Sequence, residues 1–256
     1  MNKTVWILLA LTLLLSACVT PEKGRSGNSS DIYNVTALTE RARAHVDLGA
    51  AYLEQGKYEI ALSEFNEAVE IDPSYAPAYN GLGLLYAALG EDAKAEASYK
   101  RSIELQPKNS ESHNNYGGFL CSRQRYDESI KHFLEAVKNP LYNTPNLAYA
   151  NAGICSARKN DIVNAEIYLN KALQIDPLTH SAATQLAEIQ FKRGDSITAK
   201  RTLQNALVAR PNAETLWLGV RIARALGDKD NASSYALQLR QQYPNSEQTR
   251  MLLSGK

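Results

Sequence analysis

One short pattern recurs along the chain at a nearly constant spacing, and it constrains the fold more than any other feature. Leu48-Gly49-x-x-Tyr52 returns after 34 residues as Leu82-Gly83-x-x-Tyr86, and after 34 more as Tyr116-Gly117-x-x-Leu120. Weaker copies follow at Ala152-Gly153 and Leu186-Ala187, at offsets of 36 and 34 residues. Self-similarity at such a period is typical of repeat proteins, in which each unit buries its apolar side against its neighbours.

Residues between these copies keep the same phase and divide each unit into two helices joined by a turn. Glycine within a helix costs about 1 kcal/mol relative to alanine, so Gly49 and its copies indicate places where a second helix approaches closely. Gly56, Gly90 and Gly194 fall where the turn within a unit favours left-handed backbone. Three further slots recur: a small residue at Ala61, Ala95, Ser129, Ala165, Ala199 and Ala232, a larger one at Phe65, Tyr99, Phe133, Leu169 and Leu203, and a closing proline at Pro73, Pro107, Pro177, Pro211 and Pro244.

The period and the slots resemble the tetratricopeptide repeat, a helical hairpin of about 34 residues. The resemblance implies an all-α fold, a superhelical solenoid of about six helix-turn-helix units within residues 39–256. The third unit has a small insertion from Pro140 to Pro145, which we expect to form a loop, and the sixth is degenerate, with Arg221 where glycine is expected. The expected units are residues 42–75, 76–109, 110–143, 146–179, 180–213 and 214–246.

The chain lacks the usual sequence marks of catalysis. No two of its four histidines have the spacing of a metal site, and His45 and His113 share a repeat slot with Tyr79, which predicts a packing role. Glycine-rich phosphate loops and nucleophile elbows are absent from the sequence. The balance of 28 basic and 27 acidic residues argues against nucleic acid as a partner. We therefore expect a monomeric binding scaffold without enzymatic activity, cofactor, metal or small-molecule substrate.

Residues 1–17 resemble a lipoprotein signal peptide. Lys3 precedes an apolar run from Val5 to Leu15, which as a helix would be about 16 Å long, too short to cross a membrane. The run ends in Leu15-Ser16-Ala17-Cys18, similar to the bacterial lipobox, in which the cysteine is acylated and becomes the first mature residue. The alternative is an ordinary secretory signal with a chance cysteine.

The lipobox resemblance places the protein at a membrane through a lipid anchor on Cys18. Aspartate after the cysteine would suggest inner-membrane retention, and Val19 stands there instead, which resembles an outer-membrane lipoprotein facing the periplasm. Residues 18–38 contain Pro21, Gly24 and Gly27 and show no helical period, so we expect a flexible tether.

The resemblance to tetratricopeptide arrays also points to a binding groove, because their first helices line the concave face. In the early units the inward slots are apolar with isolated amides, and asparagine can both donate to and accept from a peptide backbone. We expect an apolar peptide to bind there; the alternative is that these residues only close the superhelix. The predicted groove residues are Val46, Ala50, Leu53, Asn80, Leu84, Ala87, Asn114 and Gly118.

Two cysteines besides Cys18 lie on the first helices of adjacent units. Cys121 and Cys155 occupy slots two positions apart, and such helices pack at about 8–10 Å between axes. Facing side chains could then reach disulfide geometry, and export to the periplasm would supply an oxidising compartment. We predict a Cys121–Cys155 disulfide, with two buried thiols as the alternative.

The segment from Asn114 to Cys121, Asn-Asn-Tyr-Gly-Gly-Phe-Leu-Cys, resembles a motif of the PilF/PilW-type lipoproteins of type IV pilus assembly. That family commonly has tryptophan at the place of Gly118, and Cys155 matches its second cysteine. The resemblance implies a pilotin that binds the outer-membrane secretin subunit and promotes its localisation and multimerisation. Two alternatives are an adaptor lipoprotein that organises another envelope machine, such as cell-wall hydrolases, and an enzyme with a scattered site.

Overall fold

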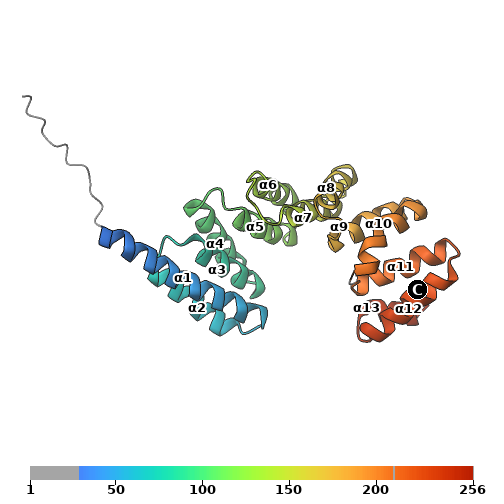
Figure 1. Ribbon diagram of the computed structural model, residues 1–256, viewed down its shortest axis with the longest axis horizontal. Helices are drawn as coiled ribbons and strands as arrows, with labels where there is room; N and C mark the ends of the chain where they lie inside the picture. The colour runs from blue at the N-terminus through green and yellow to red at the C-terminus, as the bar shows by residue number, and fades with distance from the viewer. Residues whose placement is uncertain (1–28, 210, 256) are drawn as a thin grey trace, which may run out of the picture. The chain divides into compact units, whose positions relative to one another are not determined.

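The computed structural model of the chain describes residues 29–209 and 211–255 (Figure 1), and all regular secondary structure in these ranges is α-helical. The expected signal peptide, Cys18 and the first part of the expected tether lie outside the described residues. None of the helices described combines the length and hydropathy that crossing a membrane requires. The helices are α1 (Ser29–Glu54), α2 (Tyr58–Ile71), α3 (Ala76–Ala88), α4 (Asp92–Leu105), α5 (Ser110–Ser122), α6 (Tyr126–Ala136), α7 (Pro145–Arg158), α8 (Ile162–Ile175), α9 (His180–Lys192), α10 (Ser196–Ala209), α11 (Ala213–Ala225), α12 (Lys229–Gln242) and α13 (Glu247–Leu253).

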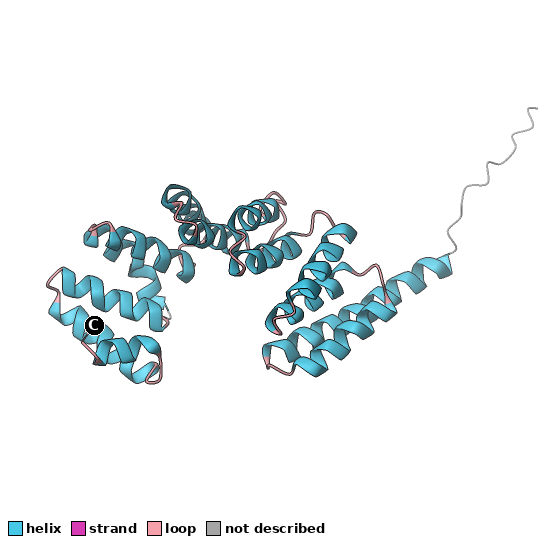
Figure 2. Ribbon diagram, turned by 180° about the vertical axis from the view of Figure 1, so that it is seen from behind, coloured by secondary structure: helices cyan, strands magenta, loops and turns pink. Residues whose placement is uncertain are grey.

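Consecutive helices pair into hairpins, from α3 with α4 to α11 with α12, and short loops connect them (Figure 2). Helices α1 and α2 form the first hairpin, in which His45 contacts Glu64 and Gly49 abuts Phe65. The turn inside each hairpin passes through left-handed backbone, at Gly56 (φ 71°), Gly90 (φ 75°) and Gly194 (φ 89°), which confirms the prediction for these glycines. In the first turn the N–H of Lys57 donates to the carbonyl of Tyr52 at 2.9 Å, the bond that closes a helix after a left-handed residue. The same conformation is taken by Gln124 (φ 61°), Asn160 (φ 68°) and Gly227 (φ 71°).

The recurrent helix glycines admit large side chains from the second helix of the same hairpin. A Cβ atom on Gly49 would lie 2.7 Å from the ring of Phe65, one on Gly83 2.6 Å from the ring of Tyr99, and one on Gly153 2.6 Å from Leu169. Phe65, which is 1% exposed, also abuts Gly81 of the next hairpin. The buried ring therefore holds two successive hairpins together, which is the physical reason for glycine at this helical position.

Helix α1 begins at Ser29, so the predicted tether over residues 18–38 is wrong for its last part, which is helical. No glycine or proline lies between Gly27 and Gly49, so no helix-breaking residue interrupts the helix that leads into the first hairpin. The insertion in the third unit is confirmed as a loop, since α6 ends at Ala136 and α7 starts at Pro145.

The sixth unit is a complete hairpin with a shifted register. Its turn glycine, Gly227, follows Gly194 by 33 residues, so the expected glycine slot holds the fully buried Val220, and the assignment of that slot to Arg221 is wrong. Arg221 instead forms an ion pair with Glu188 of the preceding hairpin, at 2.8 Å. The short helix α13 starts at a new cap, where the Ser246 hydroxyl accepts from the Thr249 N–H, and it packs on α11 and α12.

Candidate interaction surface on the first helices

Three adjoining clefts lie along the first helices of the early hairpins. The α1–α3 cleft has a volume of about 420 Å³, the α3–α5 cleft about 310 Å³, and the cleft between α5 and the loop before α7, here the α5–loop cleft, about 500 Å³. The α1–α3 cleft is lined by Arg43, Val46, Asp47, Ala50, Leu53, Glu54, Phe65, Tyr75, Pro77, Asn80, Gly81, Leu84 and Glu111.

The structure brings all eight predicted groove residues to two of these clefts. Val46, Ala50, Leu53, Asn80 and Leu84 line the α1–α3 cleft. Leu84, Ala87, Asn114 and Gly118 line the α3–α5 cleft, together with Tyr99, Asn115, Phe119, Ser122 and Asn151. Because Leu84 belongs to both, the predicted residues form one continuous surface.

These apolar residues divide into a part that packs in the core and a part that stays exposed. Val46 and Leu53 pack against the buried cluster built around Phe65, so the alternative of a purely structural role holds for much of their surface. Ala50 is exposed, and Leu84 keeps 37% of its surface open to solvent. Ala50 and Leu84 are therefore the apolar residues of this set that a binding partner can contact.

The two predicted asparagines are partly engaged within the protein. The Asn80 side chain is 7% exposed, and its Oδ1 accepts from Nδ2 of Asn115 at 3.4 Å. Oδ1 of Asn114 accepts from Nδ2 of Asn151 at 3.1 Å. Each pair bridges adjacent first helices. Each Oδ1 thus uses one of its two lone pairs inside the protein, and neither Nδ2 makes a hydrogen bond among the described residues. The expectation that these amides donate and accept at once stays a prediction.

Sequence reasoning missed the α5–loop cleft, although it predicted the loop. Leu141 at the loop tip is 83% exposed, and its N–H donates to Oδ1 of Asn139 at 3.0 Å, which folds the tip back. Burial, with a contribution from the nearby Glu111 carboxylate, raises the pKa of Tyr142. The length of the insertion in the third unit was the only feature of the sequence that pointed to this cleft. The lining residues are Asn109, Ser110, Glu111, Asn114, Asn115, Asn139, Leu141, Tyr142, Asn143 and Thr144.

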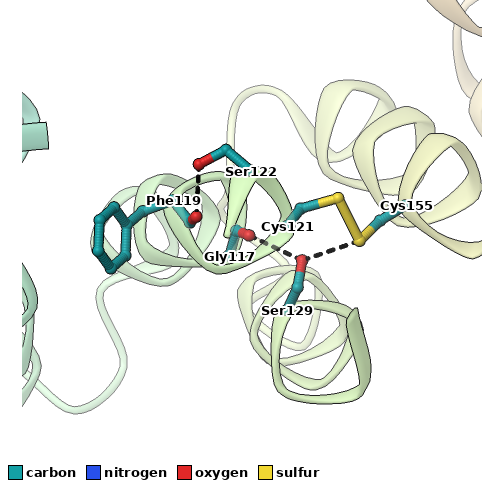
Figure 3. Close-up of a disulfide and its surroundings, with 6 residues drawn as sticks. All are labelled: Gly117, Phe119, Cys121, Ser122, Ser129 and Cys155. Carbon is teal, nitrogen blue, oxygen red and sulfur yellow. Dashed lines mark hydrogen bonds between the residues drawn. A yellow bond between two sulfur atoms is a disulfide. The ribbon is translucent and has the colours of Figure 1, made fainter. Parts of the chain in front are cut away.

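Cys121 and Cys155 meet between α5 and α7 (Figure 3), with Cα atoms 5.9 Å apart and the sulfur atoms in disulfide contact. This Cα separation lies in the usual range for disulfides. Cys155 is fully buried, and its Sγ lies 3.3 Å from Oγ of Ser129, which donates to the Gly117 carbonyl at 2.7 Å. The predicted pair thus joins the third and fourth hairpins beside the α3–α5 cleft.

Three of the histidines make contacts inside the repeat stack. Nδ1 of His45 lies 2.7 Å from Glu64 Oε2. His113, 6% exposed, contacts Nδ1 of His132 with its own Nδ1 at 2.8 Å and the Pro107 carbonyl with Nε2 at 3.0 Å. Over the described part of the chain, no three His, Cys, Asp or Glu side chains gather as metal ligands would.

Family models match four stretches of the chain. The TPR repeat model matches residues 49–90, and three tetratricopeptide repeat models match residues 76–109, 98–131 and 215–246. The last match covers the sixth hairpin, which is therefore a recognisable repeat despite its shifted register.

Two relatives extend this similarity over most of the chain. The type IV pilus assembly protein PilF of Pseudomonas aeruginosa is 31% identical over 241 residues, which is 94% of each chain. An uncharacterized protein of Haemophilus influenzae is 30% identical over 165 residues, 64% of this chain and 86% of its own.

Solved structures agree with these relatives. The structure of Pseudomonas aeruginosa PilF superposes with a TM-score of 0.74 at 31% identity, covering 86% of this chain and all of that one. That of PilW, described as a widely conserved type IV pilus biogenesis factor, gives 0.71 at 32% identity, covering 83% and 98%. A tetratricopeptide repeat protein from Parabacteroides merdae gives 0.61 at 19% identity and covers 88% of each chain, a likeness of fold alone.

Proposed function

The chain belongs to the tetratricopeptide-repeat family of type IV pilus biogenesis proteins that includes PilF and PilW, and from this membership we propose that it is an outer-membrane pilotin. In this role it binds the secretin subunit of the pilus machinery and promotes its localisation and multimerisation. The protein acts as a scaffold, by binding and not by catalysis. The observation that carries the proposal is the exposed apolar surface around Leu84, shared by two clefts, on a fold whose close relatives serve pilus assembly.

Membrane attachment through Cys18 is part of the proposal. Acylation of this cysteine would hold the repeats at the periplasmic face of the outer membrane, where secretin subunits assemble. Confinement raises the effective concentration of the scaffold near its client, so a modest affinity in the clefts is sufficient. An adaptor for cell-wall hydrolases is the second candidate, and the similarity to PilF over 94% of the chain favours the pilus role.

The test is a pair of acidic substitutions on the cleft surface. Ala50→Glu with Leu84→Glu replaces two exposed apolar positions, and we expect secretin multimers in envelope extracts to fall to background. The harsher pair Leu53→Glu with Leu84→Glu removes the larger side chain but also disturbs the cluster around Phe65. For this reason the milder pair is the primary variant.

The control changes two other exposed apolar residues, away from the clefts. Ile60→Glu with Val163→Glu alters side chains that are 43% and 71% exposed on second helices. Both double variants must keep the parent's thermal unfolding midpoint, followed by circular dichroism. Normal secretin multimers with the folded Ala50→Glu/Leu84→Glu protein would exclude this surface as the secretin site.

A further inference from the structure

The three clefts behave as one surface because neighbouring clefts share residues. Leu84 lines the α1–α3 and α3–α5 clefts. Asn114 and Asn115 line the α3–α5 and α5–loop clefts. Glu111 lines the α1–α3 and α5–loop clefts. A single bound segment can therefore contact all three, and the chemistry of the shared residues limits what that segment can be.

Hydrogen-bonding groups on the surface favour an extended segment. Nδ2 of Asn114 and Nδ2 of Asn80 make no hydrogen bond among the described residues, while one lone pair of each Oδ1 is used by a neighbouring amide. Both Nδ2 groups are donors without an acceptor, and the half-buried Asn114 is more accessible to a partner than Asn80, which is 7% exposed. A donor needs a free acceptor, and the carbonyl groups of an α-helix are bonded within the helix. An extended peptide presents free carbonyls, so it matches these donors where a docked helix would not.

Charge on the surface is negative, although the whole chain has a formal net charge of +1. The charged residues that line the three clefts are Arg43, Asp47, Glu54 and Glu111. The Arg43 guanidinium already lies 3.8 Å from Asp47 and 3.6 Å from Glu40. Within the described residues neither Glu54 nor Glu111 has a basic partner within ion-pair distance, whereas Glu96, away from the clefts, contacts both Lys100 and Arg125.

We propose that the partner of this surface is an extended, apolar peptide segment that carries lysine or arginine, with Glu111 receiving the cation at the junction of two clefts. The inference rests on the proposed function for the identity of the client protein, but not for the chemistry of the segment. Apolar side chains lie against Ala50 and Leu84, and the basic side chain lies toward Glu111. An acidic segment is repelled by the carboxylates that border the clefts.

The first experiment selects ligands without reference to any client. A display library of random 12-residue peptides is panned against the full chain in detergent, at low and at physiological salt. We expect enriched peptides to combine apolar residues with lysine or arginine, and their binding to weaken as salt screens the carboxylates. Enrichment of acidic or uncharged sequences overturns the proposal, and so does enrichment that persists on the Ala50→Glu/Leu84→Glu variant.

A substitution then tests the role of Glu111. Glu111→Gln is expected to weaken binding of the selected basic peptides by up to about fivefold, the upper end for an exposed ion pair, and to flatten the salt dependence. Glu67→Gln, an exposed carboxylate on a second helix without an ion-pair partner among the described residues, is the control and should leave binding unchanged. Equal binding by Glu111→Gln and the parent overturns the assignment of Glu111.

These outcomes separate the two proposals. If basic apolar peptides are selected and lost in Glu111→Gln, while secretin multimers remain normal in Ala50→Glu/Leu84→Glu, the segment chemistry is right and the secretin assignment is wrong. If multimers disappear but the selected peptides are acidic, the secretin assignment holds and the basic segment does not.

Discussion

At the scale of single residues, the fold depends on helical glycines, whose lack of a side chain lets the neighbouring helix approach closely. Gly49, Gly83 and Gly117 each accept the ring of an aromatic residue from the second helix, and Gly153 accepts Leu169 in the same way. An alanine in any of these positions forces a well-packed side chain or a helix backbone to move. Gly118, one residue after Gly117, has nothing within 4 Å of where a Cβ would stand.

Substitutions at two helical glycines, one crowded and one with open space, therefore test this explanation. Gly83→Ala should lower the free energy of unfolding by about 1–3 kcal/mol, because its Cβ would lie 2.6 Å from the Tyr99 ring. Gly118→Ala is the control and should be neutral or stabilising by up to about 1 kcal/mol, since alanine is the better helix former. Urea unfolding followed by circular dichroism measures both. Equal destabilisation by the two changes would contradict the role given to the rings.

The His113–His132 contact makes the third hairpin sensitive to acid. Burial, with the adjacent His113, lowers the pKa of His132 to about 4. The unfolded chain then binds more protons than the folded one between about pH 6.5 and pH 4, so stability is fully present above pH 6.5 and falls as the pH drops. Glu128, Glu135 and Lys131 also face this histidine and remain in any variant at position 132.

His132→Gln should reduce the loss of stability between pH 7 and pH 4.5. The measurement is the urea midpoint of parent and variant at each pH, and the difference between them removes the contribution of carboxylates common to both. Parallel curves for parent and variant would show that the His113–His132 contact does not titrate in this range.

At the scale of elements, most of what the sequence predicted concerns neighbours within the repeat. Slots such as Gly49 and Phe65 repeat because every hairpin packs its two helices in the same way. The hairpins and their turns could therefore be predicted. The helical start at Ser29 could not, because the residues before the first hairpin belong to no repeat. The step from Gly194 to Gly227 is 33 residues, one fewer than the usual period, and it places Val220 in the glycine slot. The sixth copy of the repeat is too weak for this deletion to be recognised in the sequence.

The candidate surface was predictable where it follows the repeat and was missed where it does not. Leu84 and its neighbours sit in slots whose direction the helical period determines. The α5–loop cleft depends on how residues 137–144 fold, and a loop that occurs once has no periodic pattern. The pairing of Asn80 with Asn115 was also missed, because it joins adjacent repeats one residue out of phase.

The Cys121–Cys155 pair links the third and fourth hairpins and gives a prediction at this scale. Closing a loop of 34 residues with a disulfide stabilises a fold by about 2–4 kcal/mol. Reduction should therefore lower the unfolding midpoint of the parent and leave that of the Cys121→Ser/Cys155→Ser variant unchanged. Mass spectrometry of the unreduced protein checks the bond directly, and two free thiols would exclude it.

At the scale of the whole molecule, the proposed function assigns location and binding to separate parts of the chain. Cys18→Ser should release the protein from the membrane fraction and abolish labelling by a fatty-acid probe. If secretin assembly depends on confinement, multimers should also fall although the clefts are unchanged. The control is Cys121→Ser/Cys155→Ser, which removes the two cysteines that are distant from Cys18 in the sequence. Continued fatty-acid labelling of Cys18→Ser would place acylation elsewhere.

Leu84 belongs to two clefts at once, and this overlap has a consequence for specificity. A side chain that presses on Leu84 from the α1–α3 cleft changes the space left in the α3–α5 cleft, so the preference at one ligand position depends on the residue at another. Selected ligands should then show correlated pairs of residues where independent pockets would give a simple consensus. The surface would then discriminate between ligands by the combination of their side chains, and not by each side chain separately.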